Sequence, residues 1–180
     1  MSNNNLEHLV LETDRLYMRV FKKEDAKSMF EMDSDPLVHK YLGNKPYTDI
    51  AQVYKYIDWV RSQYIQNGIG RFSAFLKGTN EFIGWSGLKI ESEIRDYTYN
   101  DLGYRFLQIH WGKGYATETA KAWLKYGFNE LKLEKIDAAA DVDNIGSNKV
   151  LQKIGMKKTE QFMFEGELCN WYEMAKSEYQ

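Results

Sequence analysis

Residues 111–116 read Trp-Gly-Lys-Gly-Tyr-Ala, and they separate a β-type segment, residues 102–107, from a strongly periodic helical segment, residues 115–131. Two glycines around one residue allow a sharp backbone turn that brings several N–H groups together with no side chain in the way. The helix that follows adds the positive end of its dipole. The junction predicts a binding site for an anion the size of a pyrophosphate, although a Gly-x-Gly turn before a helix is also common as a plain loop.

Length and composition predict a single domain over residues 1–180, because 180 residues that are 43% hydrophobic fill one core. Basic residues number 24 against 26 acidic ones, so no basic field favours nucleic acid or an anionic membrane as a partner. One cysteine, Cys169, and three scattered histidines provide neither a disulfide framework nor metal-ligand spacing. No export signal or membrane-length apolar run is found, so we expect a cytoplasmic protein, with residues 1–10 as a flexible tail.

Periodicity predicts alternating strands and helices along the whole chain. The predicted strands have a period of two or a β-rich composition and comprise residues 15–21, 71–77, 81–90, 99–107, 136–142, 157–164 and 168–178. The predicted helices have apolar residues at spacings of three and four and comprise residues 24–32, 48–66, 115–131 and 144–154. Thr48 and Asn144 are the predicted N-caps. Asp35-Pro36 is predicted to end the first helix and start a loop.

Several segments together resemble the GNAT superfamily of acetyl-CoA-dependent N-acetyltransferases. They are Leu-Glu-Thr-Asp-Arg-Leu-Tyr-Met-Arg at 11–19, Leu-Gly-Tyr-Arg-Phe at 102–106, Trp-Gly-Lys-Gly-Tyr-Ala-Thr-Glu at 111–118 and Asn-Ile-Gly-Ser-Asn-Lys-Val-Leu-Gln-Lys-Ile-Gly-Met at 144–156. The chain is most similar to the branch that contains the RimJ and RimL ribosomal-protein N-terminal acetyltransferases. The resemblance implies an α+β fold with a central, mixed, mostly antiparallel sheet of about seven strands and about four flanking helices. The fourth and fifth strands would splay apart, and the pantetheine arm of the cofactor would enter the gap.

The resemblance also implies acetyl-CoA as co-substrate, with no metal. Backbone amides at the sheet opening and at the glycine turn would bind the pantetheine and the pyrophosphate. With two residues of the following short helix, the implied cofactor-binding set is Tyr104, Phe106, Leu107, Trp111, Gly112, Lys113, Gly114, Tyr115, Ala116, Asn144 and Ser147. Lys113 is equally compatible with a solvated loop lysine, and Asn144 with a simple N-cap.

Two residues are candidates for catalysis. Asp101 occupies an acidic position found in this branch and would accept the proton of the acceptor ammonium, directly or through water; an ordinary edge or surface aspartate is the alternative. Ser147 would protonate the departing thiolate, although water or another tyrosine such as Tyr172 would also serve. Backbone N–H groups near Phe106 or Leu107 would polarise the thioester carbonyl.

Two departures from the family pattern limit what the resemblance implies. Ile109 stands where many relatives have Arg or Gln, so a side-chain contribution to phosphate binding is not expected. Leu151 stands where relatives with a tyrosine general acid place that tyrosine, so an acid at this position is not expected either.

The acceptor groove implied by this fold is formed by residues 33–47, by the region of Trp85 and Tyr97, and by the C-terminal hairpin around Trp171 and Tyr172. We predict an N-acetyltransferase, a monomer or a homodimer, that transfers acetyl to a primary amine by direct attack in a ternary complex. The branch favours a protein N-terminal α-amine. A small amine (polyamine, amino-acid derivative or aminoglycoside) and a non-catalytic acyl-CoA-binding module are the alternatives.

Overall fold

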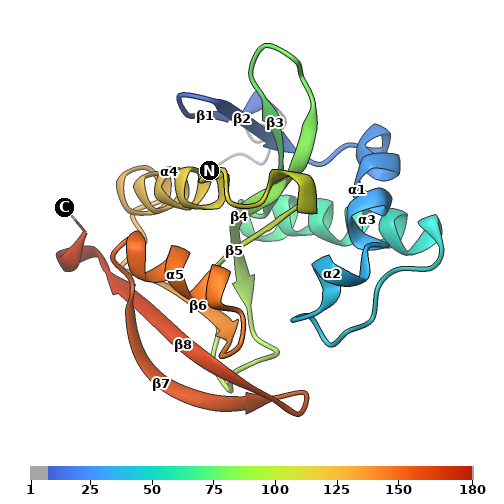
Figure 1. The fold of residues 1–180 in the computed structure, drawn as a ribbon. Coiled ribbons are helices and arrows are strands. Elements are labelled where there is room, and N and C mark those ends of the chain that lie inside the picture. The colour runs from blue at the N-terminus through green and yellow to red at the C-terminus, as the bar shows by residue number, and fades with distance from the viewer. Residues whose placement is uncertain (1–7, 180) are drawn as a thin grey trace.

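The computed structural model describes residues 8–179, and these residues form one eight-stranded sheet flanked by helices (Figure 1). The strand order is β1-β2-β3-β4-β5-β6-β8-β7, and every neighbouring pair except β5 and β6 is antiparallel. The strands are β1 Val10–Glu12, β2 Leu16–Val20, β3 Arg71–Leu76, β4 Phe82–Glu91, β5 Tyr99–Phe106, β6 Lys135–Asp141, β7 Lys157–Phe164 and β8 Glu167–Ala175. The predicted mixed, mostly antiparallel α+β fold is confirmed.

The N-terminal edge of the sheet differs from the prediction. Val10–Glu12 pairs with β2, which gives eight strands instead of about seven. The expected tail at residues 1–10 falls mostly on residues 1–7, which lie outside the described residues, and Val10 already belongs to β1. Because β1 precedes the first predicted strand, the fourth and fifth predicted strands, which were expected to splay apart, are labelled β5 and β6 in Figure 1.

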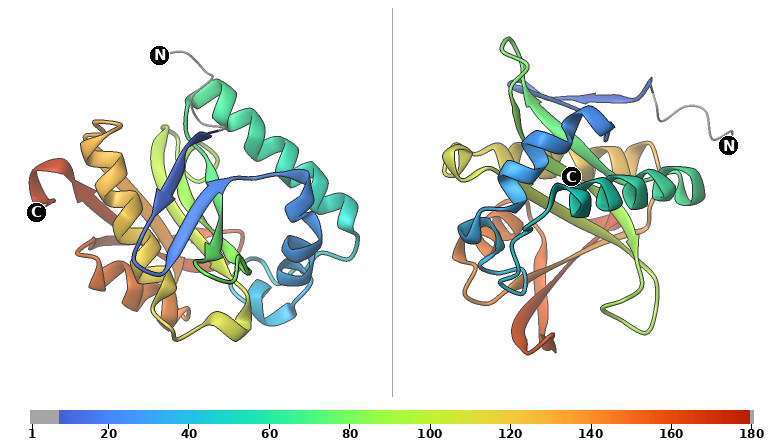
Figure 2. Two further views of the ribbon diagram at one scale, coloured as in Figure 1. Left: turned by 90° about the horizontal axis from the view of Figure 1, so that it is seen from above. Right: turned by 90° about the vertical axis from the view of Figure 1, so that its right-hand side faces the viewer.

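Helices cover both faces of the sheet. Figure 2 shows α4 and α5 on one face and α1, α2 and α3 on the other. Within residues 8–179 there are five α-helices, one more than the expected four: α1 Ala26–Asp33, α2 Pro36–His39, α3 Ile50–Asn67, α4 Tyr115–Asn129 and α5 Ile145–Lys153. Three short 3-10 turns accompany them, η2 Lys23–Asp25, η3 Gln108–His110 and η4 Lys176–Glu178. None of the helices described combines the length and the hydropathy needed to cross a bilayer.

Local capping explains where two helices differ from the prediction. Asp49, and not Thr48, is the N-cap of α3, because its carboxylate accepts the N–H of Ala51 at 2.8 Å while the side chain of Gln52 returns to the Asp49 N–H. Asp35 caps α2 in the same way by accepting the Leu37 N–H. Proline therefore starts a helix at residue 36, where a loop was expected, because Pro fits the first helical position.

The sheet opens between β5 and β6. β4 and β5 stay paired from Glu91↔Tyr99 to Gly84↔Phe106, whereas β5 and β6 share the single register pair Asp101↔Asp137. Beyond Asp101, β5 follows β4 and leaves β6. The result is a gap between two central strands, and the gap is closed at its Asp101 end.

Candidate active site

The β5 edge of the gap presents backbone groups that the sheet does not pair. Leu107 N–H donates to Ile83 O at 3.0 Å, so the amide of residue 107 faces β4. Backbone groups alternate in direction along a strand, and those of Tyr104 and Phe106 therefore face the gap. The Phe106 carbonyl accepts the indole N–H of Trp111 at 2.8 Å, which leaves its N–H directed into the opening.

Leu107 differs from the other residues of the predicted set. Its N–H is bonded to Ile83 O, and its carbonyl accepts the N–H of His110 at 2.9 Å. Both backbone groups thus have partners within the chain, because β4 and η3 enclose this residue. Of the two N–H groups considered for polarising the thioester carbonyl, the Phe106 N–H is the one that faces the gap.

The glycine turn gathers unpartnered amides. Trp111 N–H donates back to Gln108 O, and Glu118 N–H, bonded to Gly114 O at 3.0 Å, is the first helical amide bond of α4. The six N–H groups of residues 112–117 have no acceptor within residues 8–179. Gly112 and Gly114 have φ values of 73° and 84°, a region that side chains disfavour. Successive free N–H groups at a helix N-terminus form a concave anion-binding site.

The N-terminal segment holds this turn in place. Arg15 donates through Nε to Glu118 Oε2 at 2.7 Å and through Nη1 to the Lys113 carbonyl at 2.9 Å. Its guanidinium also lies 4.5 Å above the Tyr115 ring. Thr13 donates to the other Glu118 oxygen at 2.6 Å. Burial raises the pKa of Glu118, but the hydrogen bonds from Thr13 and Arg15 outweigh it, and the pKa is lowered.

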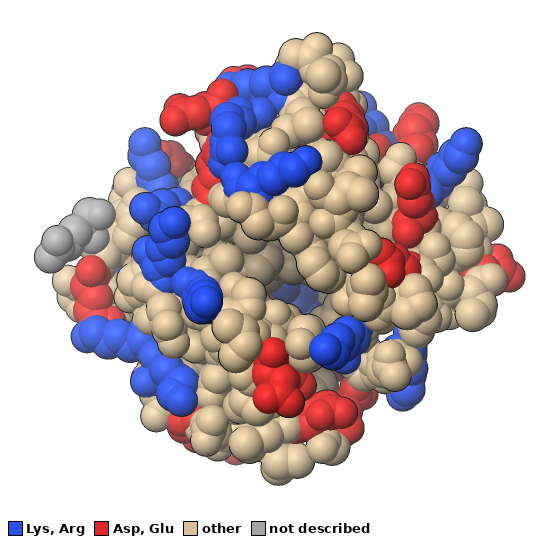
Figure 3. All heavy atoms as spheres, in the orientation of Figure 1, with Lys and Arg blue, Asp and Glu red and all other residues tan. Residues whose placement is uncertain are grey.

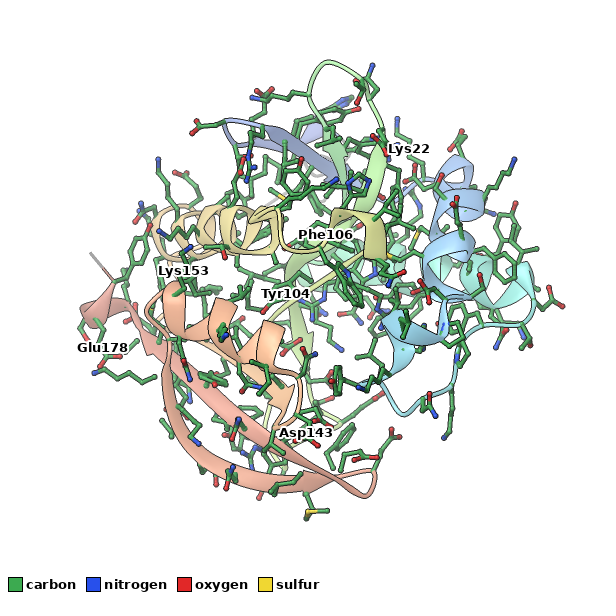
Figure 4. The ribbon with its side chains drawn as sticks, in the orientation of Figure 1. Lys22, Tyr104, Phe106, Asp143, Lys153 and Glu178 are labelled. Carbon is green, nitrogen blue, oxygen red and sulfur yellow. The ribbon has the colours of Figure 1, made fainter. Side chains whose placement is uncertain are left out.

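Tyr104 and Ser147 meet across the opening of the sheet. The Tyr104 hydroxyl donates to the Ser147 carbonyl at 3.2 Å, and the two hydroxyl oxygens are 3.0 Å apart. Asn144 starts α5 by accepting the Ser147 N–H at 3.1 Å, which confirms the predicted N-cap. Burial raises the pKa of the Tyr104 hydroxyl, so it keeps its proton. Figure 4 shows Tyr104 between α4 and α5, and Phe106 beside the turn that precedes α4.

Asp101 lies at the closed end of the gap and is 9% exposed. Its carboxylate pairs with the guanidinium of Arg71, and Arg71 Nη1 also donates to the Asp101 carbonyl at 2.9 Å and to Gly87 O. The alternative of an ordinary surface aspartate is wrong. Asp101 is a buried member of an ion pair with Arg71.

The C-terminal hairpin does not form an acceptor wall. Trp171 and Tyr172 are both 0% exposed, because the rings of Tyr99 and Phe162 pack against Trp171 and α5 covers Tyr172. The Tyr172 hydroxyl donates to Asn148 Oδ1 at 2.8 Å beneath α5. The expectations of an aromatic groove at these two residues, and of Tyr172 as an available acid, are therefore wrong.

The surface of the molecule is hollowed on the face that carries the start of α4 (Figure 3). Figure 3 shows a hollow at the centre of the face turned to the viewer, between the elements that Figure 1 labels α4, α5 and α2, with a basic side chain at its floor. Trp111, Gly112, Lys113 and Gly114 are exposed, and Tyr115 and Ala116 are partly buried in the first turn of α4. Within residues 8–179, no cluster of three or more His, Cys, Asp or Glu residues could hold a metal ion.

Sequence reasoning did not assign roles to three residues of this region. Arg15 and Glu118 fix the glycine turn, although both stand in segments that were quoted for the resemblance. Arg71 pairs with Asp101 from 30 positions away, and no local pattern indicates such a contact. The only sequence feature that could have indicated this ion pair is that Arg71 and Asp101 carry opposite charges in two strands that are otherwise mostly apolar.

Comparison with known proteins identifies the family of the chain. The family model described as an acetyltransferase (GNAT) domain matches residues 15–157. An uncharacterized N-acetyltransferase, p20 of Bacillus licheniformis, is 34% identical over 166 residues, which are 92% of this chain and 88% of the relative. The chain belongs to the GNAT acetyltransferase family, whose members use acetyl-CoA, and it is an acyltransferase of the GNAT type.

Solved structures show the same fold. A GNAT-family acetyltransferase from Bacillus anthracis superposes with a TM-score of 0.79 at 27% identity and covers 94% of this chain and 100% of its own. A spermidine N-acetyltransferase from Vibrio cholerae, solved with CoA and spermine, has a TM-score of 0.75 at 19% identity and covers 93% of this chain and 99% of its own. RimL, a ribosomal L7/L12 α-N-protein acetyltransferase solved with coenzyme A, has a TM-score of 0.75 at 16% identity and covers 93% and 98%.

Proposed function

We propose that the chain transfers the acetyl group of acetyl-CoA to a primary amine by direct attack within a ternary complex. The observation that supports it most strongly is the set of six unpartnered N–H groups of residues 112–117 at the N-terminus of α4. A diphosphate fits such a site because its oxygens accept several hydrogen bonds at once and its charge matches the helix dipole. The cofactor would supply an activated acetyl thioester.

The pantetheine arm would lie in the gap between β5 and β6. The amides of Tyr104 and Phe106 face this gap and lack a strand partner, and an extended amide chain would satisfy them as a missing strand does. The Phe106 N–H would polarise the acyl carbonyl. Asn144 and Ser147, at the start of α5, border the same opening.

Ser147 would deliver a proton to the sulfur, and Tyr104 would orient the serine. The hydroxyl of Tyr104 lies 3.0 Å from that of Ser147 and keeps its own proton at neutral pH. On the acceptor side, Asp101, which is paired with Arg71, stays our candidate for receiving the ammonium proton through water. Alignment of two bound reactants supplies much of the acceleration in such a case, on the order of 7–11 kcal/mol.

A peptide α-amine is the acceptor that we favour, in keeping with the RimJ/RimL-like branch and with the structural likeness to a ribosomal-protein acetyltransferase. The equal likeness to a spermidine acetyltransferase makes a small amine the second candidate.

The test is a panel of peptides, amino-acid amides, polyamines and aminoglycosides offered with acetyl-CoA, with detection of free thiol. Amine-dependent thiol release is expected, highest with peptide α-amines. If acetyl-CoA raises Tm but no amine releases thiol, the chain is a binding module and catalysis is excluded. If acetyl-CoA neither binds nor reacts, the assignment of the glycine turn fails as well.

A further inference from the structure

The face of β5 opposite Tyr104 holds a group of buried polar side chains with unused hydrogen-bonding atoms. Asp33 at the end of α1, His39 at the end of α2 and Trp85 on β4 are 0%, 4% and 6% exposed. Asp33 Oδ2, both ring nitrogens of His39 and Trp85 Nε1 have no hydrogen-bond partner among the described residues. Buried polar atoms are nearly always paired, so four such atoms in one place indicate a missing partner.

Contacts show that these residues form one group. Arg105 donates to Asp33 Oδ1 at 2.6 Å, and its guanidinium lies 5.2 Å from the centre of the Trp85 ring. His39 Nε2 is 3.5 Å from the same Asp33 oxygen. Tyr47 closes the group, because its N–H donates to the Asp33 carbonyl and its ring packs 5.6 Å from that of His39.

The position of the group is the one an acceptor would need. Arg105 stands between Tyr104 and Phe106, the residues whose amides face the gap in the sheet. Side chains alternate across a strand, so the group with Arg105 lies on the other side of β5 from Tyr104 and Ser147. An acceptor bound there would approach the opening from the side away from α4 and α5.

The charge balance disfavours a polycation. Asp33 is paired with Arg105, and the nearby Asp101 is paired with Arg71, so each carboxylate already faces one guanidinium. A polyamine needs an excess of negative charge, and this group has none. The unused atoms consist of one carboxylate oxygen, one indole N–H that only donates, and an imidazole that can do either.

We propose that Asp33 and Trp85 form the acceptor subsite of this enzyme and that it takes an α-amino carbonyl group, as found in a peptide N-terminus or an amino-acid amide. The amine donates to Asp33 Oδ2, and the carbonyl next to it accepts the Trp85 Nε1–H. His39 lines the same subsite. A polyamine has no carbonyl and leaves the indole N–H unpaired. This inference rests on the proposed function and narrows its substrate.

The test crosses two enzyme variants with two substrates. Leucinamide has the α-amino carbonyl, and isoamylamine is the same alkyl amine without it; kcat/KM is measured for both by thiol release. Trp85→Phe removes the N–H and keeps a ring. We expect it to lower kcat/KM for leucinamide about tenfold, as loss of one buried hydrogen bond would, and to lower kcat/KM for isoamylamine clearly less. Asp33→Asn should lower kcat/KM for both substrates, because both contain the amine.

Trp123→Phe is the matched control. Trp123 also has a buried, unpartnered indole N–H, but it lies on α4 and packs against Phe72. We expect no change in acceptor kcat/KM for this variant, and the KM for acetyl-CoA should stay at its normal value in Trp85→Phe. Melting curves identify a variant that has lost its fold, and Trp85→Phe remains informative if Asp33→Asn unfolds.

Equal losses for both substrates in Trp85→Phe, no loss for either, or a preference for spermidine over leucinamide would overturn the subsite. Those results would not contradict the proposed acetyl transfer. Absence of thiol release with every amine would instead overturn the proposed function, so the two failures are distinguishable.

Discussion

Tyr104 and Ser147 connect two elements that the sheet itself does not join. Tyr104 stands on β5 and Ser147 in the first turn of α5, and their hydroxyls are 3.0 Å apart. Because burial raises the pKa of Tyr104, the pair has two protons available throughout the neutral range. Two hydroxyls in contact can act as one proton-donating unit.

The first prediction concerns this pair. Ser147→Ala should lower kcat by about 100-fold, the lower end of the range for a general acid, and Tyr104→Phe should lower it less. Because the two act as a unit, the double variant should be no slower than Ser147→Ala alone. Steady-state kinetics at saturating acetyl-CoA measures this. Unchanged turnover in Ser147→Ala would remove the serine from the mechanism and leave water as the proton source.

Glu118 is the second residue with a testable role. Glu118→Gln weakens the contacts to Thr13 and Arg15 that hold the glycine turn. We expect KM for acetyl-CoA to rise about fivefold, equivalent to ~1 kcal/mol for a partly exposed ion pair, with kcat unchanged. Glu130→Gln, at the other end of α4, is the control and should behave as the wild type. A fall in kcat with KM unchanged would contradict a role in positioning the turn.

The pH dependence of this contact follows from the lowered pKa of Glu118. A carboxyl group whose folded-state pKa is depressed contributes stability above its unfolded value and loses that contribution as pH falls through the folded value. Glu118 should therefore remain ionised at every pH above about 5, the range of ordinary assays. The KM difference between wild type and Glu118→Gln should be constant over that range.

At the scale of elements, the glycine turn and α4 act together. The turn exposes six N–H groups only because Gly112 and Gly114 adopt positive φ, which directs successive amides to one side. A Cβ at Gly112 would meet no atom within 4 Å. Substitution there perturbs the backbone conformation alone.

The third prediction uses that property. Gly112→Ala should weaken acetyl-CoA binding by about tenfold, since a left-handed alanine costs roughly 1–2 kcal/mol and the turn can avoid it by moving its amides. Gly78→Ala is the control, because Gly78 also has positive φ with nothing within 4 Å but lies in the turn between β3 and β4. Calorimetric titration with CoA compares the two. Equal affinity in both variants would show that the turn does not bind the cofactor.

At the scale of the whole molecule, the sheet is held open at one end and closed at the other. Asp137 on β6 lies at the closed end, paired in register with Asp101. It is 1% exposed, and burial raises its pKa although Lys135 Nζ lies 3.0 Å away. Lys135 is the cation that faces this otherwise buried carboxylate. Such a group reduces stability when it is ionised.

The fourth prediction follows from the sign of that shift. A carboxyl group whose folded-state pKa is raised costs stability as pH rises through the folded value, and costs nothing below the unfolded value. Asp137→Asn should therefore raise Tm at pH 7 by about 2–4 °C, equivalent to ~1 kcal/mol in a domain of this size. In this variant Lys135 still has an ion-pair partner, because its Nζ lies 3.2 Å from the Glu173 carboxylate. The gain should disappear at about pH 3, below the usual aspartate value; the same gain at both pH values would contradict the assignment to charge burial.

Much of this architecture was accessible from the sequence. The period of two at residues 15–21 and the apolar spacing of residues 115–131 predicted β2 and α4, because a half-buried element must repeat its apolar side chains with its own geometry. Gly-x-Gly before α4 and Asn144 before α5 marked two helix starts whose chemistry is local. Local sequence does not fix the exact start of a helix, as Thr48 and Asp49 show. Either residue can cap a helix, and the reciprocal contact with Gln52 makes Asp49 the N-cap.

The sequence by itself determined most of the elements, their order and the glycine turn, because these depend on interactions between residues a few positions apart; β1 and α2 were not predicted. Only the tertiary structure decided that Asp101 faces Arg71, that Ser147 reaches Tyr104, that Trp171 and Tyr172 are buried, and that Asp33, His39 and Trp85 meet. Those contacts join residues many positions apart along the chain. Their partners are fixed by strand register and by which face of the sheet each helix covers, and neither is written in any local pattern.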